Sequence, residues 1–371
     1  MSTFNTGGLE STYGGAPDFS QGLTVGGTDI LTLVTPTEYH TGSTQPTSTA
    51  HGAVWWDGTT LRQYINAGWV TVSITAPPVW FGNTAAISGG LRVTSRQTMI
   101  STVSIPTTGN ATSMGGLIVS QGVWATASCS NNSRGLISGG EGSSGAVNVI
   151  QYVTFSSLGN STDFGDLAVA TAAHAGCSDG VYGVFGGGSY NPTNTIQYVT
   201  VNTTGNATDF GDLTVGRSYI ASCADATYGV WAGGNTTPVN TIDYITIATP
   251  GNATDFGDMV AALYGRSGCS NRTRGLFAGG RTSSSTTNAI DYITIATPSN
   301  ATDFGNLSLS RSAVAACCNA DRAVFAGGQT TTSSYSHNNT IDYVSIDTPG
   351  NATDFGDLPV SLMYASASSG D

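Results

Sequence analysis

Six stretches of the chain alternate hydrophobic and polar residues. They read MISTVSI, VIQYVTF, TIQYVTV, TIDYITI, AIDYITI and TIDYVSI, at residues 99–105, 149–155, 195–201, 241–247, 289–295 and 340–346. A period of two residues is typical of β-strands, and the Thr, Val, Ile and Tyr that dominate these runs favour strands. No stretch shows the 3.6-residue period of a helix. The pattern therefore predicts an all-β protein.

Two further markers recur in fixed order around each alternating run. The text NATDFGDL, intact or varied, starts at Asn110, Asn160, Asn206, Asn252, Asn300 and Asn351. A glycine pair ends an apolar run at Gly89, Gly139, Gly186, Gly233, Gly279 and Gly327. Each unit is predicted to hold four strands, a to d: a small-residue strand around a Cys, the strand before the glycine pair, the alternating run, and TDFGDL. Four strands in about 50 residues are typical of a β-propeller blade.

The blade count indicates how the ring closes. Five Cys-centred strands, around Cys129, Cys177, Cys223, Cys269 and Cys317, precede five of the blades. The text VWFGNTAAISGG at residues 79–90 has no such strand before it, whereas the chain ends with MYASASSG at residues 363–370. We expect this last segment to complete the first blade, which removes the exposed edges of the sheet. The prediction is a six-bladed propeller over residues 79–371.

The first 78 residues differ from the repeats. Residues 1–28 are rich in Gly and turn-forming residues and are expected to form an arm that orders only against a partner, or a disordered tail. Residues 29–76 predict a small β attachment module, and Pro77–Pro78 a stiff linker. The turn WDGTT between apolar runs favours a hairpin. Four aromatic residues of this module are expected to cluster: Trp55, Trp56, Tyr64 and Trp69.

The repeat unit resembles the Kelch repeat family, through its apolar strand ending in Gly-Gly, the Tyr of the third strand and an aromatic residue in the fourth. The family usually has Trp at the last position, where this chain has Phe164, Phe210, Phe256, Phe304 and Phe355. Arg217 and Arg311 match the Arg that precedes the first strand of Kelch units, and Arg266 lies three residues out of register. The resemblance implies a Kelch-like β-propeller.

A second resemblance lies in the N-terminal module. The text GAVWWDGTTLRQYINAGWV, at residues 52–70, resembles a short β motif of bacteriophage virion proteins. It implies that the chain belongs to a phage particle, as a tail fibre or other appendage, and that it is assembled in the host cytoplasm.

Composition narrows the classes of partner. The chain has 371 residues, 11 basic against 23 acidic, and a formal net charge of −12; every basic residue is Arg. Such a chain lacks the positive surface needed for nucleic acid or anionic lipid. We also expect no membrane span, because no run of 18 apolar residues occurs, and no secretory signal, because MSTFNTGGLE lacks a basic and an apolar region.

The residues that could carry chemistry mostly follow the repeat. The cysteines recur with the repeat period and are interpreted as small buried hydrophobic residues. The Asp pairs of DFGD, such as Asp163 with Asp166, are expected to hydrogen-bond backbone N–H groups, and the Asn of each N-x-[ST] to form a turn. The four histidines, His40, His51, His174 and His337, have no ligand spacing. We therefore expect no catalytic residue, no cofactor and no metal site.

The loops between the second and third strands of each blade vary most and are the candidate contact surface. The contact candidates on that face are Tyr190, Asn191, Asn235, Arg281, Tyr335 and His337. Tolerant loops with no ligand explain the variation equally well. The expected function is a phage virion structural protein for host-surface adhesion or particle decoration. It would contact other virion proteins through the N-terminal module, form a homo-oligomer in the particle, and meet a host glycan or protein. Alternatives are an intracellular Kelch-type interaction adaptor and a carbohydrate oxidase.

Overall fold

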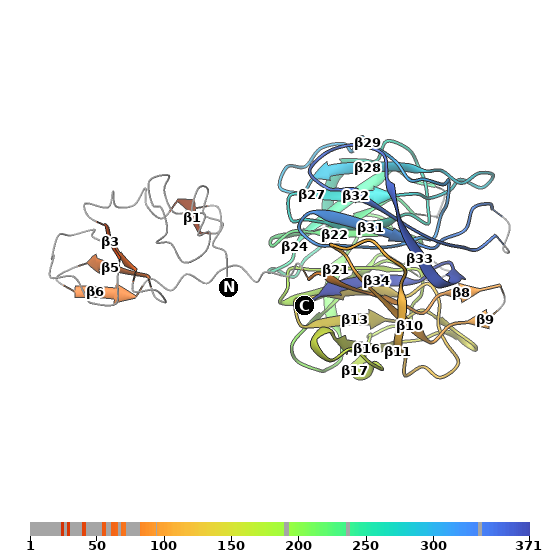
Figure 1. The fold of residues 1–371 in the computed structure, drawn as a ribbon, viewed down its shortest axis with the longest axis horizontal. Coiled ribbons are helices and arrows are strands. Elements are labelled where there is room, and N and C mark those ends of the chain that lie inside the picture. The colour runs from red at the N-terminus through yellow and green to blue at the C-terminus, as the bar shows by residue number, and fades with distance from the viewer. Residues whose placement is uncertain are drawn as a thin grey trace. The chain divides into compact units, whose positions relative to one another are not determined.

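The computed structural model describes residues 82–371, apart from residues 94, 189–192, 235–237 and 333–335, and the backbone of six short strands before residue 82. The chain divides into two units, Met1–Pro78 and Val79–Asp371. In Figure 1, the first unit's strands are red to orange and the second unit runs from orange to blue.

The first unit contains two small sheets. β1 (Thr24–Val25) pairs with β2 (Thr28–Asp29). A four-stranded sheet has the order β3-β4-β5-β6, with bounds Tyr39–Thr41, Val54–Trp56, Leu61–Ile65 and Gly68–Thr71. β4, β5 and β6 are antiparallel, whereas β3 pairs parallel to β4. The predicted hairpin around WDGTT corresponds to the β4–β5 pair.

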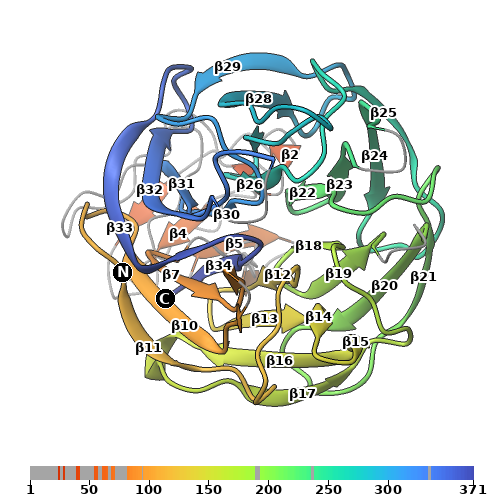
Figure 2. The ribbon, with the colours of Figure 1, turned by 90° about the vertical axis from the view of Figure 1, so that its right-hand side faces the viewer.

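The second unit is a six-bladed β-propeller, as the sequence predicts, and it is compatible with a Kelch-like repeat. Figure 2 looks down its axis and shows the blades as a ring, with β12, β18, β22, β26, β30 and β34 around the centre. Each blade is a four-stranded antiparallel sheet.

Each blade has its innermost strand at the axis and its outermost strand at the rim. From the axis outward, blade 1 has β34 (Ser366–Gly370), β7 (Thr84–Ser88), β10 (Met99–Ser104) and β11 (Thr112–Gly116). In the same order, blade 2 has β12 (Ala127–Ser130), β13 (Arg134–Ser138), β16 (Val149–Thr154) and β17 (Thr162–Asp166). Blade 3 has β18 (Ala175–Ser178), β19 (Tyr182–Gly186), β20 (Thr195–Thr200) and β21 (Thr208–Asp212). Blade 4 has β22 (Ala221–Ala224), β23 (Tyr228–Ala232), β24 (Thr241–Thr246) and β25 (Thr254–Asp258). Blade 5 has β26 (Ser267–Ser270), β27 (Arg274–Ala278), β28 (Ala289–Thr294) and β29 (Thr302–Asn306). Blade 6 has β30 (Ala315–Cys318), β31 (Arg322–Ala326), β32 (Asn338–Ser345) and β33 (Thr353–Leu362).

Short elements complete the unit. β8 (Leu91–Arg92) pairs with β9 (Ser95–Arg96), and β14 (Glu141–Gly142) with β15 (Gly145–Ala146). A 3₁₀ turn, η1, covers Phe155–Ser157. Among the described residues, no helix is long and apolar enough to span a bilayer.

The C-terminal strand closes the ring, as predicted. β34 pairs antiparallel with β7, from Ser366 opposite Ser88 to Gly370 opposite Thr84. The side chain of the last residue extends this closure, because Asp371 Oδ1 accepts a hydrogen bond of 2.7 Å from the Asn83 N–H.

The core lies between blades, which explains the alternating runs. In β24, Ile242 is buried with Phe277 and Ile293 of blade 5. Ile245 of the same strand is buried with the preceding blade's Phe210. The two faces of a third strand are therefore both buried, one against the preceding blade and the other against the following blade.

Two backbone features account for the glycine and phenylalanine markers. Both glycines that follow each second strand have positive φ, and in blade 3 the pair is Gly187–Gly188, one residue later than the Gly186 of the sequence prediction. In the fourth strand, the register shifts opposite Phe256: Ile242 faces Gly257 and Asp243 faces Asp255. The Phe is thus the extra residue of a β-bulge, which turns its ring into the core.

Candidate functional site

The antiparallel order of strands a to d places the a–b and c–d turns on one face, which we call the turn face. The b–c loops and d–a connections lie on the opposite face, which we call the loop face.

The a–b turns are built alike in five blades. In blade 4, Asp225 Oδ1 accepts hydrogen bonds of 2.6 Å from the N–H groups of Thr227 and Tyr228. The same carboxylate or amide oxygen serves the turns that begin at Asn131, Asp179, Asn271 and Asn319. These are Asx turns, a local structural role.

The Asn of each N-x-[ST] links two blades. Asn252 Oδ1 accepts a hydrogen bond from Asp212 N–H at the end of the preceding blade's outer strand, at 3.1 Å. Equivalent bonds reach Asn160, Asn206, Asn300 and Asn351, and Asn110 closes the circle by accepting from Asp357 N–H at 3.0 Å. The expected turn role was therefore incomplete, because these side chains hold neighbouring blades together.

The expected role of the DFGD carboxylates is wrong. Among the described hydrogen bonds, the blade contacts at Asp166 use its backbone: its N–H donates to Asn206 and its C=O accepts from the Ala207 N–H. The first Asp of each pair is exposed on the outer strand. These residues therefore contribute negative charge to the rim of the propeller.

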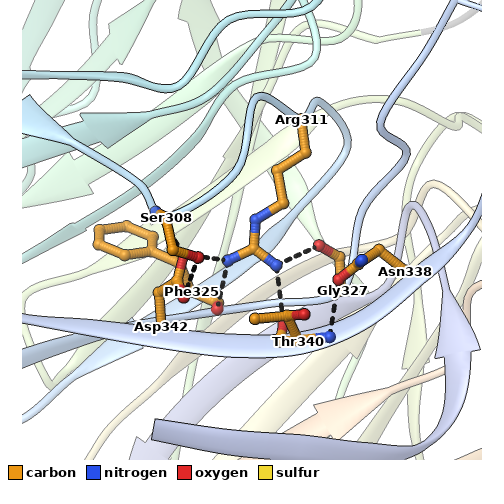
Figure 3. Close-up of polar contacts among 7 residues, drawn as sticks. All are labelled: Ser308, Arg311, Phe325, Gly327, Asn338, Thr340 and Asp342. Carbon is orange, nitrogen blue, oxygen red and sulfur yellow. Dashed lines mark hydrogen bonds and ion pairs between the residues drawn. The ribbon is translucent and has the colours of Figure 1, made fainter. Parts of the chain in front are cut away.

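Three buried ion pairs reinforce blades 4, 5 and 6. Arg311 donates from Nη2 to Asp342 Oδ2 at 2.7 Å, and from Nη1 to the carbonyl oxygens of Gly327 and Thr340 (Figure 3). Asp342 also accepts from the Ser308 hydroxyl. The side chains of both charged residues are completely buried.

Of the other two ion pairs, one repeats this geometry and one reaches it from a different position in the chain. Arg217 binds Asp243 as Arg311 binds Asp342. Arg266, three residues out of register, still reaches Asp291, with 2.5 Å between Nη1 and Oδ2. Burial lowers the pKa of Arg266 and raises that of Asp291, and the pairing opposes both shifts.

Blades without this Arg carry a neutral residue in place of the Asp. Gln151 and Gln197 stand there in blades 2 and 3, whose residues at the Arg311 position are Val123 and Thr171. At these positions the Arg and the Asp are thus present together or absent together. This pattern indicates a structural role for the ion pairs.

The cysteines fill the space between inner strands. A Cβ on Gly229 would lie 2.9 Å from Cys177 Sγ of the preceding blade, and one on Gly275 only 2.4 Å from Cys223 Sγ. Cys129, Cys177 and Cys223 thus each fit against a glycine of the next blade. All six cysteines are free and buried, and burial raises the pKa of the Cys177 and Cys223 thiols.

The loop face has a closed ring of backbone hydrogen bonds at its centre. One residue per blade, just before the inner strand, donates its N–H to the equivalent carbonyl of the preceding blade, at 2.7–2.9 Å. The six residues are Ala125, Ala173, Tyr219, Gly265, Ala313 and Tyr364. All six have positive φ, between 54° and 65°. The ring encircles the axis and fixes the mouth of the central channel.

Four partly exposed aromatic residues cross this mouth, and we call them the aromatic string: Trp124, Tyr364, Tyr219 and Tyr264. Successive ring centroids lie 5.2, 5.5 and 6.3 Å apart. Tyr364 belongs to blade 1 and Tyr219 to the opposite blade 4, so their rings meet over the axis. Arg281 continues the string, with its guanidinium carbon 4.9 Å from the Tyr264 centroid.

The channel below is narrow. A cavity of about 100 Å³ adjoins Tyr219 and Tyr364 and is lined by Thr126, His174 and Arg266 among small residues. Pockets for small molecules are several times larger, so this space fits only water molecules. Burial lowers the pKa of His174 to about 3, which keeps its ring neutral, and its Nε2 lies 2.9 Å from the Ser138 hydroxyl.

The predicted contact residues are only partly described. Arg281 lies on the loop face beside Tyr264. His337 lies on the same face, where its Nδ1 accepts a hydrogen bond from Val93 N–H at 3.3 Å. Partial burial lowers the pKa of His337. The other four candidates, Tyr190, Asn191, Asn235 and Tyr335, lie outside the described residues.

The predicted aromatic cluster of the attachment module is described through its backbone alone. Trp55 and Trp56 lie in β4, Tyr64 in β5 and Trp69 in β6, and Tyr64 is paired directly with Trp69. Side-chain contacts among the four lie outside what the structure describes.

Sequence reasoning missed the aromatic string, because it considered only the b–c loops. Trp124, Tyr219, Tyr264 and Tyr364 lie in d–a connections. The available signal was variation between copies of the repeat: Tyr219 and Tyr364 stand where other blades have Ala or Gly.

Comparison with known proteins does not assign the chain to a family. No family model matches the chain, and no curated protein matches it either. Among the described residues, no group of three or more His, Cys, Asp or Glu side chains is placed to hold a metal ion.

Proposed function

We propose that this protein is a non-enzymatic structural component of a bacteriophage particle. It would be a fibre, spike or capsid appendage that displays the propeller for adhesion to the host surface or for decoration of the particle. Assembly would take place in the host cytoplasm, with the chain present as a homo-oligomer in the particle.

The observation that carries a display role is the difference between the two propeller faces. The turn face repeats the same Asx turns in five of six blades. The loop face differs from blade to blade and presents the aromatic string. A rigid scaffold that carries one variable face is typical of binding proteins.

The phage assignment rests on residues 52–70 and their resemblance to virion proteins. Residues 1–78 form a unit separate from the propeller, which suits a module that attaches to other virion proteins. The absence of lysine and the net charge of −12 argue against a partner with a phosphate backbone.

The non-enzymatic part of the proposal is supported by the titratable groups of the described region. His174 is neutral and buried, and burial raises the pKa of the Cys129 and Cys317 thiols. None of these groups is suited to act as a base or nucleophile near neutral pH.

Peptide mass spectrometry of density-purified particles from the source culture tests the proposal. We expect the full-length chain at a fixed copy number relative to the major capsid protein. Absence from particles, together with abundance in the soluble lysate, would overturn the proposal and favour an intracellular interaction adaptor.

A deletion separates attachment from display. A chain without residues 1–76 is expected to fold its propeller and to disappear from particles. Normal incorporation of this shortened chain would show that the N-terminal module does not attach the protein.

A further inference from the structure

We propose that the aromatic string on the loop face binds a neutral oligosaccharide. This inference rests on the proposed adhesion function and names its ligand class and site. The side chains concerned are Trp124, Tyr364, Tyr219 and Tyr264, with Arg281 at one end and Glu141 at the other.

The fold does not require aromatic residues at the channel mouth. The hydrogen-bonded ring closes with the same left-handed backbone over Ala125, Ala173 and Ala313. Bulky side chains are unfavourable in this conformation, and residues held in it cluster at functional sites. Tyr219 and Tyr364 nevertheless occupy two positions of the ring. A plug for the channel explains these two rings, but not Trp124 and Tyr264 farther from the axis.

The backbone at both ends of the string is fixed by hydrogen bonds, which reduces the entropy lost on binding. Trp124 and Glu141 are joined by two backbone hydrogen bonds, and Tyr264 and Arg281 by two equivalent bonds. These pairs belong to blades 2 and 5, which are opposite in the ring. The anchoring residues at both ends of the string are thus fixed by the propeller backbone.

The polar groups at the two ends have unused hydrogen-bonding capacity. Within the part of the chain that the structure describes, Glu141 Oε2 and Arg281 Nε are buried and have no hydrogen-bond partner. One is an acceptor and the other a donor, on opposite sides of the axis. Because Glu141 is acidic and Arg281 basic, a ligand with uniform charge would be repelled at one end, whereas a neutral ligand with many hydroxyl groups is compatible with both ends.

The shape of the surface favours a sugar chain over a small molecule in the channel. The cavity below the string, about 100 Å³, is too small for a ligand pocket, so a ligand must lie across the face. The ring spacing of 5.2–6.3 Å is comparable to the length of one hexose unit. Tyr and Trp offer apolar ring faces to the C–H face of a pyranose, and polar edges to its hydroxyl groups.

The test uses the purified full-length chain on an array of defined neutral and acidic oligosaccharides and bacterial surface polysaccharides, followed by calorimetry with each glycan bound. Two double variants copy residues found in other blades. Y219A/Y364A introduces the Ala of blades 2, 3 and 6, and W124S/Y264S the Ser of Ser218 and Ser312. The control, Y228R, lies at an a–b turn and introduces the residue found at Arg134, Arg274 and Arg322.

We expect neutral glycans to bind the wild-type chain, with affinity at least about tenfold weaker in each double variant. The Y228R control should bind as the wild type, and all variants should keep its thermal unfolding temperature. Binding of acidic glycans alone, binding of none, or unchanged affinity in the double variants would each overturn the proposal. Particle mass spectrometry reads out the virion role independently, so a protein that is in the particle but binds no glycan refutes only this inference.

Discussion

Removal of one member of a buried ion pair leaves an unpaired charge in the interior, and this makes Asp342 a sensitive position. We expect Asp342→Ala to lower the free energy of unfolding by about 3–5 kcal/mol, because Arg311 would remain buried without its carboxylate. Equilibrium unfolding in urea measures this loss. A loss below about 1 kcal/mol would contradict a structural role for the pair.

A matched double variant separates loss of charge from loss of packing. Arg311→Val with Asp342→Gln reproduces Val123 and Gln151 of blade 2, where no buried charge is present. We expect this variant to be more stable than Asp342→Ala alone. Equal destabilisation would show that the space around Arg311, rather than its charge, limits stability.

His174 makes stability depend on pH. Its pKa is lowered by burial to about 3, from an ordinary value near 6.5, so the unfolded chain binds its proton more readily than the folded chain. Its effect on stability is absent above pH 6.5 and grows as the pH falls toward 3. We expect a loss of about 1.4 kcal/mol per pH unit in this range.

The matched variant for this pH effect comes from blade 6. His174→Val with Ser138→Ala copies Val314 and Ala326. Unfolding free energies between pH 6.5 and 4.5 should fall less steeply in this variant than in the wild type, since carboxylates titrate equally in both. Parallel pH profiles would contradict the assignment to His174.

At the scale of elements, β34 is the strand on which the ring depends. Deletion of residues 363–371 would expose the β7 edge and remove the closing hydrogen bonds between Tyr364 and its neighbours. We expect the shortened chain to lose cooperative unfolding and to aggregate, because an unpaired strand edge recruits other chains. Size-exclusion chromatography and thermal unfolding by circular dichroism measure both effects.

A circular permutant provides the control for this deletion. Gly370 and Gly82 are in close contact, so residues 363–371 can be joined directly ahead of residue 82. This chain should regain a monomeric, cooperatively folded propeller. A contrary outcome is that the permutant fails to fold while the unpermuted chain without residues 1–76 folds. That result would show that folding depends on the order of the strands along the chain, and not only on the pairing of β34 with β7.

Most elements of the propeller could be predicted because the repeat carries their signal. The alternating runs reflect burial on both faces of each third strand, and the missing inner strand of blade 1 indicated ring closure. The position of the blade 3 glycine pair was wrong by one residue, since three consecutive glycines leave the register open. The bulge at Phe256 and the backbone role of Asp166 could not be predicted, because they depend on which residue is unpaired across the sheet.

At the scale of the whole molecule, the candidate site is assembled from distant segments. Tyr219 and Tyr364 are 145 positions apart along the chain but meet over the axis, with 5.5 Å between ring centroids. Repeat counting predicts which face the connections occupy. It cannot predict that side chains from opposite blades touch, because this depends on the diameter of the ring at its mouth.

The division of the chain into two units predicts that the propeller folds independently of the N-terminal unit. Residues 82–371 contain all six blades, the closing strand and the hydrogen-bonded ring at the axis. We expect a chain of residues 79–371 to unfold within about 2 °C of the propeller transition of the full-length protein. Differential scanning calorimetry of both chains measures this. A transition lowered by more than about 5 °C would mean that the N-terminal unit stabilises the propeller, and that its loss from particles could not be ascribed to attachment alone.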